Sequence, residues 1–270
     1  MSFSPDIADY AEGIVLAVDK PYRWTSADVI RKLKFAAIRH FGKKNLKVGH
    51  AGTLDPLATG VLLVCIGNAC KRAQQLQDHD KEYIARIRFG ATTPSYDLEK
   101  EVDRRFPFEH ITADKVRDAL PAFLGEQEQV APLFSAKSVD GVRAYELARK
   151  LYRSGRAAEL DAAALDTLQR NKICISELEL ISFGESSLLS APEDGPGASS
   201  RIHVADTSGL GLPEAEIRIA CSKGTYIRAF ARDLGEALGS GAHLSGLIRS
   251  RSGDYSLEKS LSLEQALALL

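Results

Sequence analysis

The chain has 270 residues, 44% hydrophobic and 26% charged, so it is long enough to bury a large core and lies in the ordinary globular range. A formal net charge of −1 excludes a uniform coat of positive charge that would bind nucleic acid without specificity. The N-terminal segment MSFSPDIADYAEG is polar and acidic, unlike a signal peptide, and no apolar run approaches the ~18 residues of a membrane span. We therefore expect a cytoplasmic protein that does not associate with a membrane.

The cysteines are scattered along the chain and form no C-x-x-C pair or zinc-binding pattern with histidine. The sequence therefore predicts free thiols in a reducing compartment and no metal site. The four residues are Cys65, Cys70, Cys174 and Cys221.

The first third of the chain alternates short apolar runs with one amphipathic stretch. Gly13–Pro21 reads as a buried strand that leads into a loop. A helix over Ala27–Phe41 follows, with Thr25 or Ser26 as its N-cap and Gly42 as its stop. Further strands are expected at Val61–Gly67, with a short helix after it, and at Lys81–Gly90, where apolar and charged residues alternate.

The rest of the chain contributes helices, two long strands and a loop rich in Gly, Ser and Pro. Thr112 caps a helix that Pro121 interrupts, and Gly141–Gly155 reads as an amphipathic helix. The strands are expected at Lys172–Phe183 and Glu214–Ser222, and the last helices at Gly224–Gly239 and in SLEQALALL. The pattern predicts an α+β fold with a mixed, largely antiparallel central sheet flanked by helices.

The expected organisation is a single catalytic domain over residues 1–270. Residues 1–12 are taken as an N-terminal tail and residues 189–213 as a mobile surface loop. The roles of segments 155–171 and 189–213 and the oligomeric state do not follow from the sequence, and a monomer is the default expectation.

Positive charge is concentrated between residues 20 and 50, where the only acid is Asp28. Such a run is either a solvated helix face or a surface that attracts the phosphates of a nucleic acid. The basic residues are Lys20, Arg23, Arg31, Lys32, Lys34, Arg39, Lys43, Lys44 and Lys47.

The run GHAGTLDPLATG, from Gly49 to Gly60, follows this basic segment and is rich in glycine. Glycine lets a backbone turn tightly and approach a ligand closely. The run lacks the endings of a P-loop and the G-x-G-x-x-G spacing, so no nucleotide cofactor is indicated. Taken alone, Asp55 before Pro56 is typical of a turn, and His50 of a structural hydrogen bond.

Several motifs keep one order along nearly the whole chain: DKP followed by TS, GHAGTLDPLATG, KEY at Lys81–Tyr83, APLFSAKSVDGVRAYELARK, CSKGTYIR and GAHLSGLIRSRSG. In this combination the chain resembles the TruB family of tRNA pseudouridine synthases. The resemblance implies the pseudouridine synthase fold with a catalytic cleft, and conversion of a uridine in the T loop of tRNA to pseudouridine.

The resemblance also implies roles for particular residues. Asp55 is the catalytic nucleophile, Tyr83 stacks on the flipped uracil, and Arg228 pairs with the aspartate. His50 contacts the RNA loop beside the extruded base. Lys20 and Leu247 lie in family motifs that frame the site.

These roles are chemically reasonable without a cofactor or metal. A free aspartate has a pKa of about 4 and is charged at neutral pH, so it can act as a nucleophile. A guanidinium in contact counters its desolvation, and an aromatic ring offers a stacking face to an extruded base. The sequence does not decide whether Asp55 attacks the sugar or the base, or only supports proton abstraction from the ribose.

The chain departs from the family pattern at the turn after DKP, at its end, and in residues 155–171 and the loop after Leu188, which fit the pattern poorly. Arg23-Trp24 stands in the turn after DKP, where the family usually has glycine, and the chain ends soon after GAHLSGLIRSRSG, so no PUA domain is expected. Two other functions stay open: the same chemistry on another structured RNA, and a non-catalytic protein that binds or folds tRNA. No guide RNA is expected as a partner.

Overall fold

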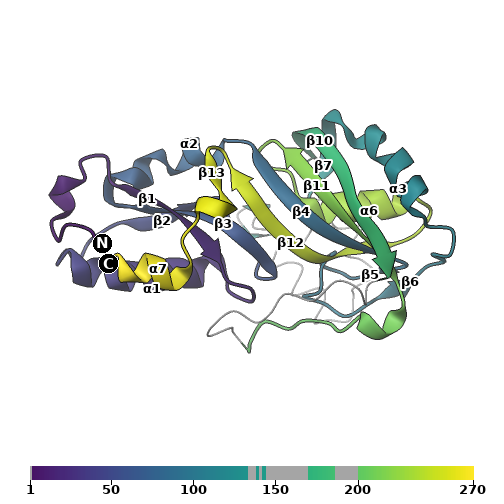
Figure 1. Ribbon diagram of the computed structural model, residues 1–270, viewed down its shortest axis with the longest axis horizontal. Coiled ribbons are helices and arrows are strands. Elements are labelled where there is room, and N and C mark those ends of the chain that lie inside the picture. The colour runs from purple at the N-terminus through teal and green to yellow at the C-terminus, as the bar shows by residue number, and fades with distance from the viewer. Residues whose placement is uncertain (1, 133–137, 140–141, 144–169, 186–199) are drawn as a thin grey trace. The chain divides into compact units, whose positions relative to one another are not determined.

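The computed structural model describes residues 2–132, 138–139, 142–143, 170–185 and 200–270 (Figure 1). The helices are α1 Ser26–His40, α2 Ala73–Gln77, α3 Ala113–Ala119, α6 Ile227–Ala237 and α7 Leu263–Ala268. The strands are β1 Ile14–Lys20, β2 Val48–Ala51, β3 Ala58–Ile66, β4 Lys81–Phe89, β5 Ala91–Thr92, β6 Arg104–Arg105, β7 Gly125–Val130, β8 Ser138–Val139, β9 Val142–Arg143, β10 Arg170–Glu185, β11 Pro213–Cys221, β12 Ala242–Ser252 and β13 Tyr255–Ser256.

The described residues form two compact units. The first unit contains residues 2–84, 200–202 and 247–270, and the second contains 85–132, 138–139, 142–143, 170–185 and 203–246. Among the described residues, the chain passes between the units within β4, between Ile202 and His203, and within β12. The single domain expected over 1–270 stays a prediction.

In the first unit, β3 is the central strand. It pairs antiparallel with β1, from Ile14↔Ile66 to Lys20↔Gly60, and with β2. It also pairs with β12 in a parallel register that places Leu247 opposite Ala58. Nearly every residue of β3 is buried, as expected for a strand covered on both faces.

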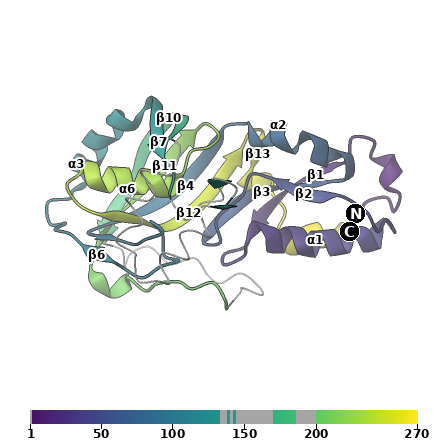
Figure 2. The ribbon, with the colours of Figure 1, turned by 180° about the vertical axis from the view of Figure 1, so that it is seen from behind.

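Helices α1 and α7 lie side by side against the strands of the first unit (Figures 1 and 2). Thr25 and Asp28 form a capping box that starts α1, and Gly42 in a left-handed conformation follows its end. Val29, Leu33 and Ala37 are fully buried. The helix therefore begins and ends where its cap residues predict.

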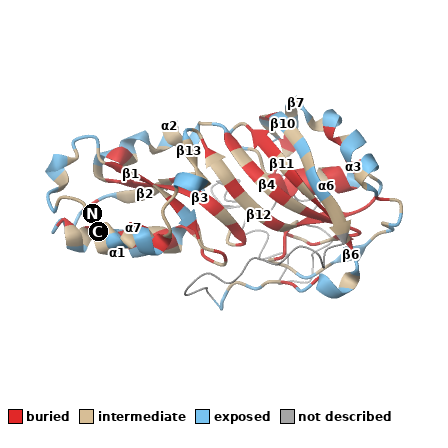
Figure 3. Ribbon diagram, in the orientation of Figure 1, coloured by how far each residue is buried: buried red, intermediate tan, exposed pale blue. Residues whose placement is uncertain are grey.

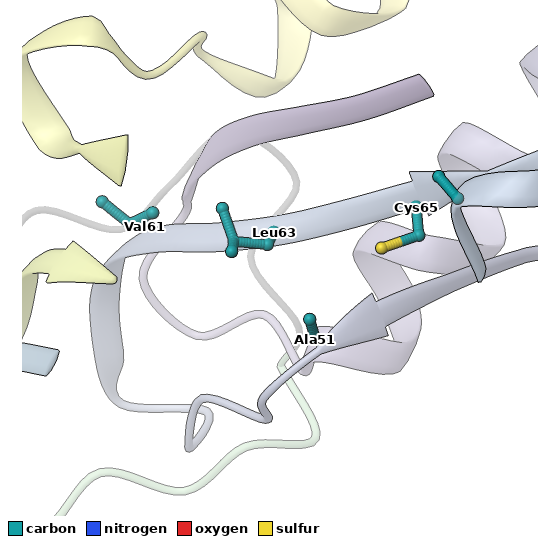
Figure 4. Packing of buried hydrophobic residues seen from close by; sticks show 5 residues of the cluster. Ala51, Val61, Leu63 and Cys65 are labelled. Carbon is teal, nitrogen blue, oxygen red and sulfur yellow. The ribbon is translucent and has the colours of Figure 1, made fainter. Parts of the chain in front are cut away.

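A small core cluster lies on one side of β3, as Figure 4 shows for Val61, Leu63 and Cys65 with Ala51 of β2. These side chains share a face because alternate residues of a strand point the same way. This packing fixes the register between β2 and β3, the two strands that flank Asp55.

In the second unit the strands are hydrogen bonded in the order β4, β11, β10, β7. The β10 pairs with β11 and β7 are antiparallel. Helix α6 covers one face of these strands (Figure 2), and its residues Phe230 and Leu234 are buried. Figure 3 shows the buried residues concentrated along these strands. The predicted α+β class with a mixed, mostly antiparallel sheet is confirmed.

Two helix predictions need correction. Val142–Arg143 form strand β9, paired with Ser138–Val139, so the start of the predicted helix Gly141–Gly155 is wrong, and the rest of it lies outside the described residues. Helix α6 begins at Ile227 rather than Gly224, because Gly224 takes a positive φ and the Thr225 hydroxyl donates to the Ser222 carbonyl instead.

Two segments that were expected to be peripheral make defined contacts. In residues 2–12, the Phe3 amide donates to the Leu269 carbonyl at 2.9 Å, and the rings of Phe3 and Tyr10 pack edge to face. In residues 200–213, Ala205, Thr207 and Leu212 are buried. No helix in the described residues has the length and apolarity to cross a membrane. All four cysteines are free, as expected.

Candidate active site

Asp55 lies in a short turn between β2 and β3, residues 52–57, which we call the Asp55 turn. The sequence predicted a longer loop over Gly49–Gly60, but both ends of that run are strand, because Gly49 pairs with Cys65 and Ala58 with Leu247. Only six residues are left to reverse the chain. A turn this short holds the Asp55 backbone between two paired strands.

The start of α1 fixes one side of the Asp55 turn. The buried Ser26 hydroxyl donates to the Leu54 carbonyl at 3.0 Å and accepts from the Leu54 amide at 2.9 Å. The Asp55 carbonyl accepts from the Ala58 amide at 3.1 Å. Hydrogen bonds within the protein therefore hold the backbone on both sides of Asp55, which makes the turn rigid.

Lys20, at the end of β1, contacts the same turn through a backbone carbonyl. Its fully buried ammonium donates to the carbonyls of Pro21 at 2.9 Å, Trp24 at 2.6 Å and Pro56 at 3.2 Å. Burial lowers the pKa of Lys20 to about 7, although the charge of Asp55 opposes this shift. Lys20 is thus about half protonated at neutral pH, interacts electrostatically with Asp55, and fastens the turn that carries it.

Arg249 of β12 is a second buried cation on the Asp55 turn, with 1% of its surface exposed. Its guanidinium donates to the carbonyls of Val61 at 2.7 Å, Gly52 at 3.1 Å and Thr53 at 3.5 Å. Arg249 therefore holds the outgoing strand and the start of the turn together.

Gly60 allows this close approach between β3 and β12. Its φ is +97°, and a Cβ at this position would lie 2.3 Å from the Arg249 carbonyl oxygen. The Gly60 amide donates to Asp19 Oδ1 at 3.0 Å. Burial raises the pKa of Asp19, while the hydrogen bond from Gly60 opposes the rise. Any side chain here would separate the two strands that position Arg249.

His50 lies in β2, opposite Val64 of β3. Burial, assisted by the charge of Arg249, lowers the pKa of His50, so the ring is neutral at physiological pH. Within the described residues, its buried Nδ1 has no hydrogen-bond partner. The contact of His50 with RNA stays a prediction.

Tyr83 and Leu247 also belong to the first unit. Tyr83 lies in β4 with 9% of its surface exposed, and Leu247 lies in β12 opposite Ala58. The structure therefore brings Lys20, His50, Asp55, Tyr83 and Leu247 into one compact unit. The stacking role of Tyr83 stays a prediction.

Arg228 lies in the second unit, in the first turn of α6, and is 5% exposed. Its Nη1 donates to the Ser95 carbonyl at 3.2 Å, and its Nε lies 3.7 Å from Asp97 Oδ2. Asp97 is held in turn by the Ser95 hydroxyl at 2.6 Å and the Glu99 amide at 2.9 Å. The pairing of Arg228 with Asp55 stays a prediction.

Comparison with known proteins identifies the family. The family description "TruB family pseudouridylate synthase (N terminal domain)" matches residues 39–189. A protein of Phocaeicola vulgatus named tRNA pseudouridine synthase B is 50% identical over 256 residues, which cover 95% of this chain and 92% of that protein. The chain belongs to the TruB family of pseudouridylate synthases.

More distant matches agree with this assignment. A Deinococcus radiodurans protein of the same name is 38% identical over 93% of this chain and 77% of its own length. A solved Cbf5-Nop10-Gar1 complex contains a chain with the same fold, at a TM-score of 0.61 and 23% identity, covering 99% of this chain and 58% of that chain. A structure of an H/ACA RNP bound to a substrate RNA has a similar chain at a TM-score of 0.59 and 21% identity.

Sequence reasoning missed two buried charged residues that contact the predicted site residues or their turn. Arg249 was quoted only as part of GAHLSGLIRSRSG, and Asp97, which pairs with Arg228, belonged to no motif. A charge is almost never fully buried unless it is paired, but burial was not visible for either residue. The signal that was available is the position of Arg249 two residues after Leu247, on the same face of one strand.

Proposed function

We propose that this protein converts a uridine in the T loop of tRNA to pseudouridine, with Asp55 as the catalytic carboxylate. The observation that carries the proposal is the Asp55 turn, whose backbone is fixed by Ser26, Lys20 and Arg249. The names of its relatives, tRNA pseudouridine synthase B, support tRNA as the substrate. A carboxylate on a rigid turn that is held by the charged Arg249 and a partly protonated Lys20 suits a reaction that develops charge on a sugar or base.

The reaction is an isomerisation, so every atom of the substrate is kept. The bond between ribose C1′ and uracil N1 breaks, a bond forms between C1′ and uracil C5, and the C5 proton leaves while N1 regains a proton. Asp55 is the nucleophile or base that starts this exchange. No external oxidant or reductant is needed, because the product is an isomer of the substrate.

The target base must leave its stack to reach Asp55, at a cost of a few kcal/mol. Tyr83 would cover one face of the extruded uracil, and His50 would contact the RNA that the base has left. Arg228 would hold the Asp55 carboxylate. In an RNA loop whose fold already unstacks the target base, extrusion costs less. This favours a structured loop as the substrate.

The outer face of α1 would carry the RNA backbone. Between Val29 and Leu54 the chain has no acid, and Arg31, Lys34 and Arg39 are exposed on α1. Ser26, at the start of the same helix, is bonded to Leu54 of the Asp55 turn. The helix thus extends a positive surface away from the site, which attracts phosphates without reading sequence.

The test replaces Asp55 with Asn, which removes the nucleophile but keeps its size. Pseudouridine formation on a T-arm transcript should disappear, while RNA binding should stay within about threefold of the original. Asp80→Asn, the same change at an exposed site of the first unit, is the control and should keep full activity. Activity in Asp55→Asn would overturn the role of Asp55.

The substrate is tested separately by mapping pseudouridine across total RNA from cells that lack the gene. Loss confined to the T loop of tRNA supports the proposal. An unchanged T loop with losses elsewhere would assign the same chemistry to another RNA. No loss at any site would favour the non-catalytic alternative.

A further inference from the structure

The turn that carries Asp97, residues 93–97, contains an unusual backbone conformation. Tyr96 has a φ of +58°, and among the described residues only Arg23 shares a positive φ without being glycine. The left-handed region costs an ordinary L-residue about 1 kcal/mol or more. Glycine or asparagine would adopt it more easily, so the tyrosine side chain must offset this cost with a contact.

That contact is with α6. The Arg232 guanidinium carbon lies 5.3 Å from the centre of the Tyr96 ring, within the range of a cation–π interaction, and the two side chains also share a hydrogen bond. Arg232 itself is held by Asp233 Oδ1 at 2.7 Å and donates to the Val130 carbonyl at 3.2 Å. The ring of Tyr96 therefore rests on a guanidinium that is already fixed in place.

Arg228 and Arg232 are four residues apart on α6, so their side chains lie on the same face of the helix. Arg228 donates to the Ser95 carbonyl and pairs with Asp97, the two neighbours of Tyr96. The turn thus meets α6 at two points one helical turn apart. The backbone of Tyr96 is also pinned, because its amide donates to the Thr93 carbonyl at 3.0 Å and its carbonyl accepts from the Leu244 amide at 2.9 Å.

We propose that Tyr96 is a positioning residue for the reaction: its ring, seated on Arg232, locks the turn so that Ser95 and Asp97 hold Arg228 in its working orientation. This inference rests on the proposed function through the role of Arg228. Tyr96 touches neither substrate nor reacting atoms in this scheme. Its effect passes through Asp97 to the guanidinium of Arg228.

The decisive variant is Tyr96→Asn, which accepts the left-handed backbone but removes the ring. We expect kcat to fall roughly tenfold with KM for the RNA unchanged, because a misplaced catalytic contact slows the chemical step and leaves ground-state binding intact. Tyr96→Phe loses the hydrogen bond to Arg232 but keeps the ring over it, so kcat should stay close to the original if the ring is the operative group. Tyr96 and Arg232 line a cavity of about 170 Å³, and Tyr96 is only half-buried, so the Asn variant should melt close to the original.

A matched control separates this role from a general loosening of α6. Phe123 packs on Phe230 of the same helix at 5.3 Å between ring centres. Phe123→Leu should lower stability and leave kcat unchanged. Arg232→Met is the second variant. In the double variant its kcat loss should not add to that of Tyr96→Asn, because both substitutions remove the same contact between Tyr96 and Arg232.

The outcomes distinguish the inference from the proposed function. If Arg228→Met abolishes activity but Tyr96→Asn keeps the original kcat, the positioning role is overturned and the proposed function stands. If Tyr96→Phe fails to restore kcat, the ring is not the operative group and the inference is also overturned. Full activity in Arg228→Met would overturn the role of Arg228, and the role of Tyr96 with it.

Discussion

The two units hold their functional side chains in different ways. In the first unit, the buried cations Lys20 and Arg249 donate to backbone carbonyls around the Asp55 turn. In the second unit, buried Arg228 and Arg88 are matched by the carboxylates of Asp97 and Glu214. Carbonyl oxygens satisfy the hydrogen bonds of a cation without cancelling its charge.

The difference bears on the chemistry. Arg249 keeps its positive charge on the Asp55 turn, where an anionic RNA would benefit from it. In the second unit the charges are balanced locally, as in the Arg88 cluster, where Glu214 Oε2 accepts at 2.8 Å from Nη2 and also accepts from Ser245. In the first unit, backbone carbonyls therefore satisfy the buried side chains of Lys20 and Arg249, whereas in the second unit carboxylates pair with the buried arginines. The variants below test that contrast, from the largest expected effect to the smallest.

Gly60→Ala should have the largest effect on stability. The new methyl would meet the Arg249 backbone at 2.3 Å in a residue whose φ is +97°, so both packing and backbone are strained. We expect a loss of about 4 kcal/mol in the free energy of unfolding, measured by urea denaturation. Gly125→Ala is the matched control, with φ of +87° but nothing within 4 Å, and should lose only about 1 kcal/mol. Equal losses would show that backbone strain, rather than the approach of β3 to β12, sets the cost.

Arg249→Met tests the cation on the Asp55 turn directly. The carbonyls of Val61 and Gly52 would lose their donor, at about 3 kcal/mol of unfolding free energy, and kcat should fall because the start of the turn is released. Arg251→Met, two residues along the same strand and only partly buried, should change both quantities little. An unchanged kcat in Arg249→Met would mean that Arg249 serves stability alone.

His243 gives a pH test of the second unit. Its Nδ1 lies 2.9 Å from the Ala91 carbonyl, and burial lowers its pKa to about 4. In the unfolded chain the His243 imidazole takes up a proton as pH falls through about 6.5, whereas in the folded chain it stays neutral down to about pH 4. The free energy of unfolding therefore decreases as pH falls below about 6.5. From pH 7 to pH 5 the loss should be about 2 kcal/mol in urea unfolding.

The comparison for this test is His243→Asn, whose amide nitrogen can replace Nδ1 as donor to Ala91. The variant should be less stable at pH 7, but its stability should fall less between pH 7 and pH 5. The difference in slope, rather than the difference in stability, is the measured quantity. The same slope in both proteins would show that His243 is protonated in the folded state.

Arg39→Glu should have the smallest effect and should leave the fold unchanged, because Arg39 is exposed on the outer face of α1. If this face lies along the RNA backbone, the affinity for RNA should fall. A plot of the logarithm of the association constant against the logarithm of salt concentration should become less steep by about 1. Glu264→Lys, at an exposed position of α7, is the control for a surface charge change. An unaltered slope would place the RNA elsewhere.

The sequence determined most of the secondary structure of the first unit. The cap at Thr25, the stop at Gly42 and the apolar runs of β1 and β3 are local signals, and local signals suffice for elements whose caps and periodicity agree. Asp55, His50, Tyr83 and Lys20 followed from motif order and resemblance rather than from any local property. The structure adds that they belong to one compact unit.

Other features depended on contacts between residues far apart in sequence, and only the tertiary structure decided them. The burial of Arg249 and its bonds to Val61 and Gly52 join residues nearly two hundred positions apart. The same is true of Asp97 with Arg228 and of Tyr96 with Arg232. A sequence motif shows which residue types are present, but burial and long-range pairing decide whether a charged side chain is a solvated surface group or a buried cation that fastens a catalytic turn.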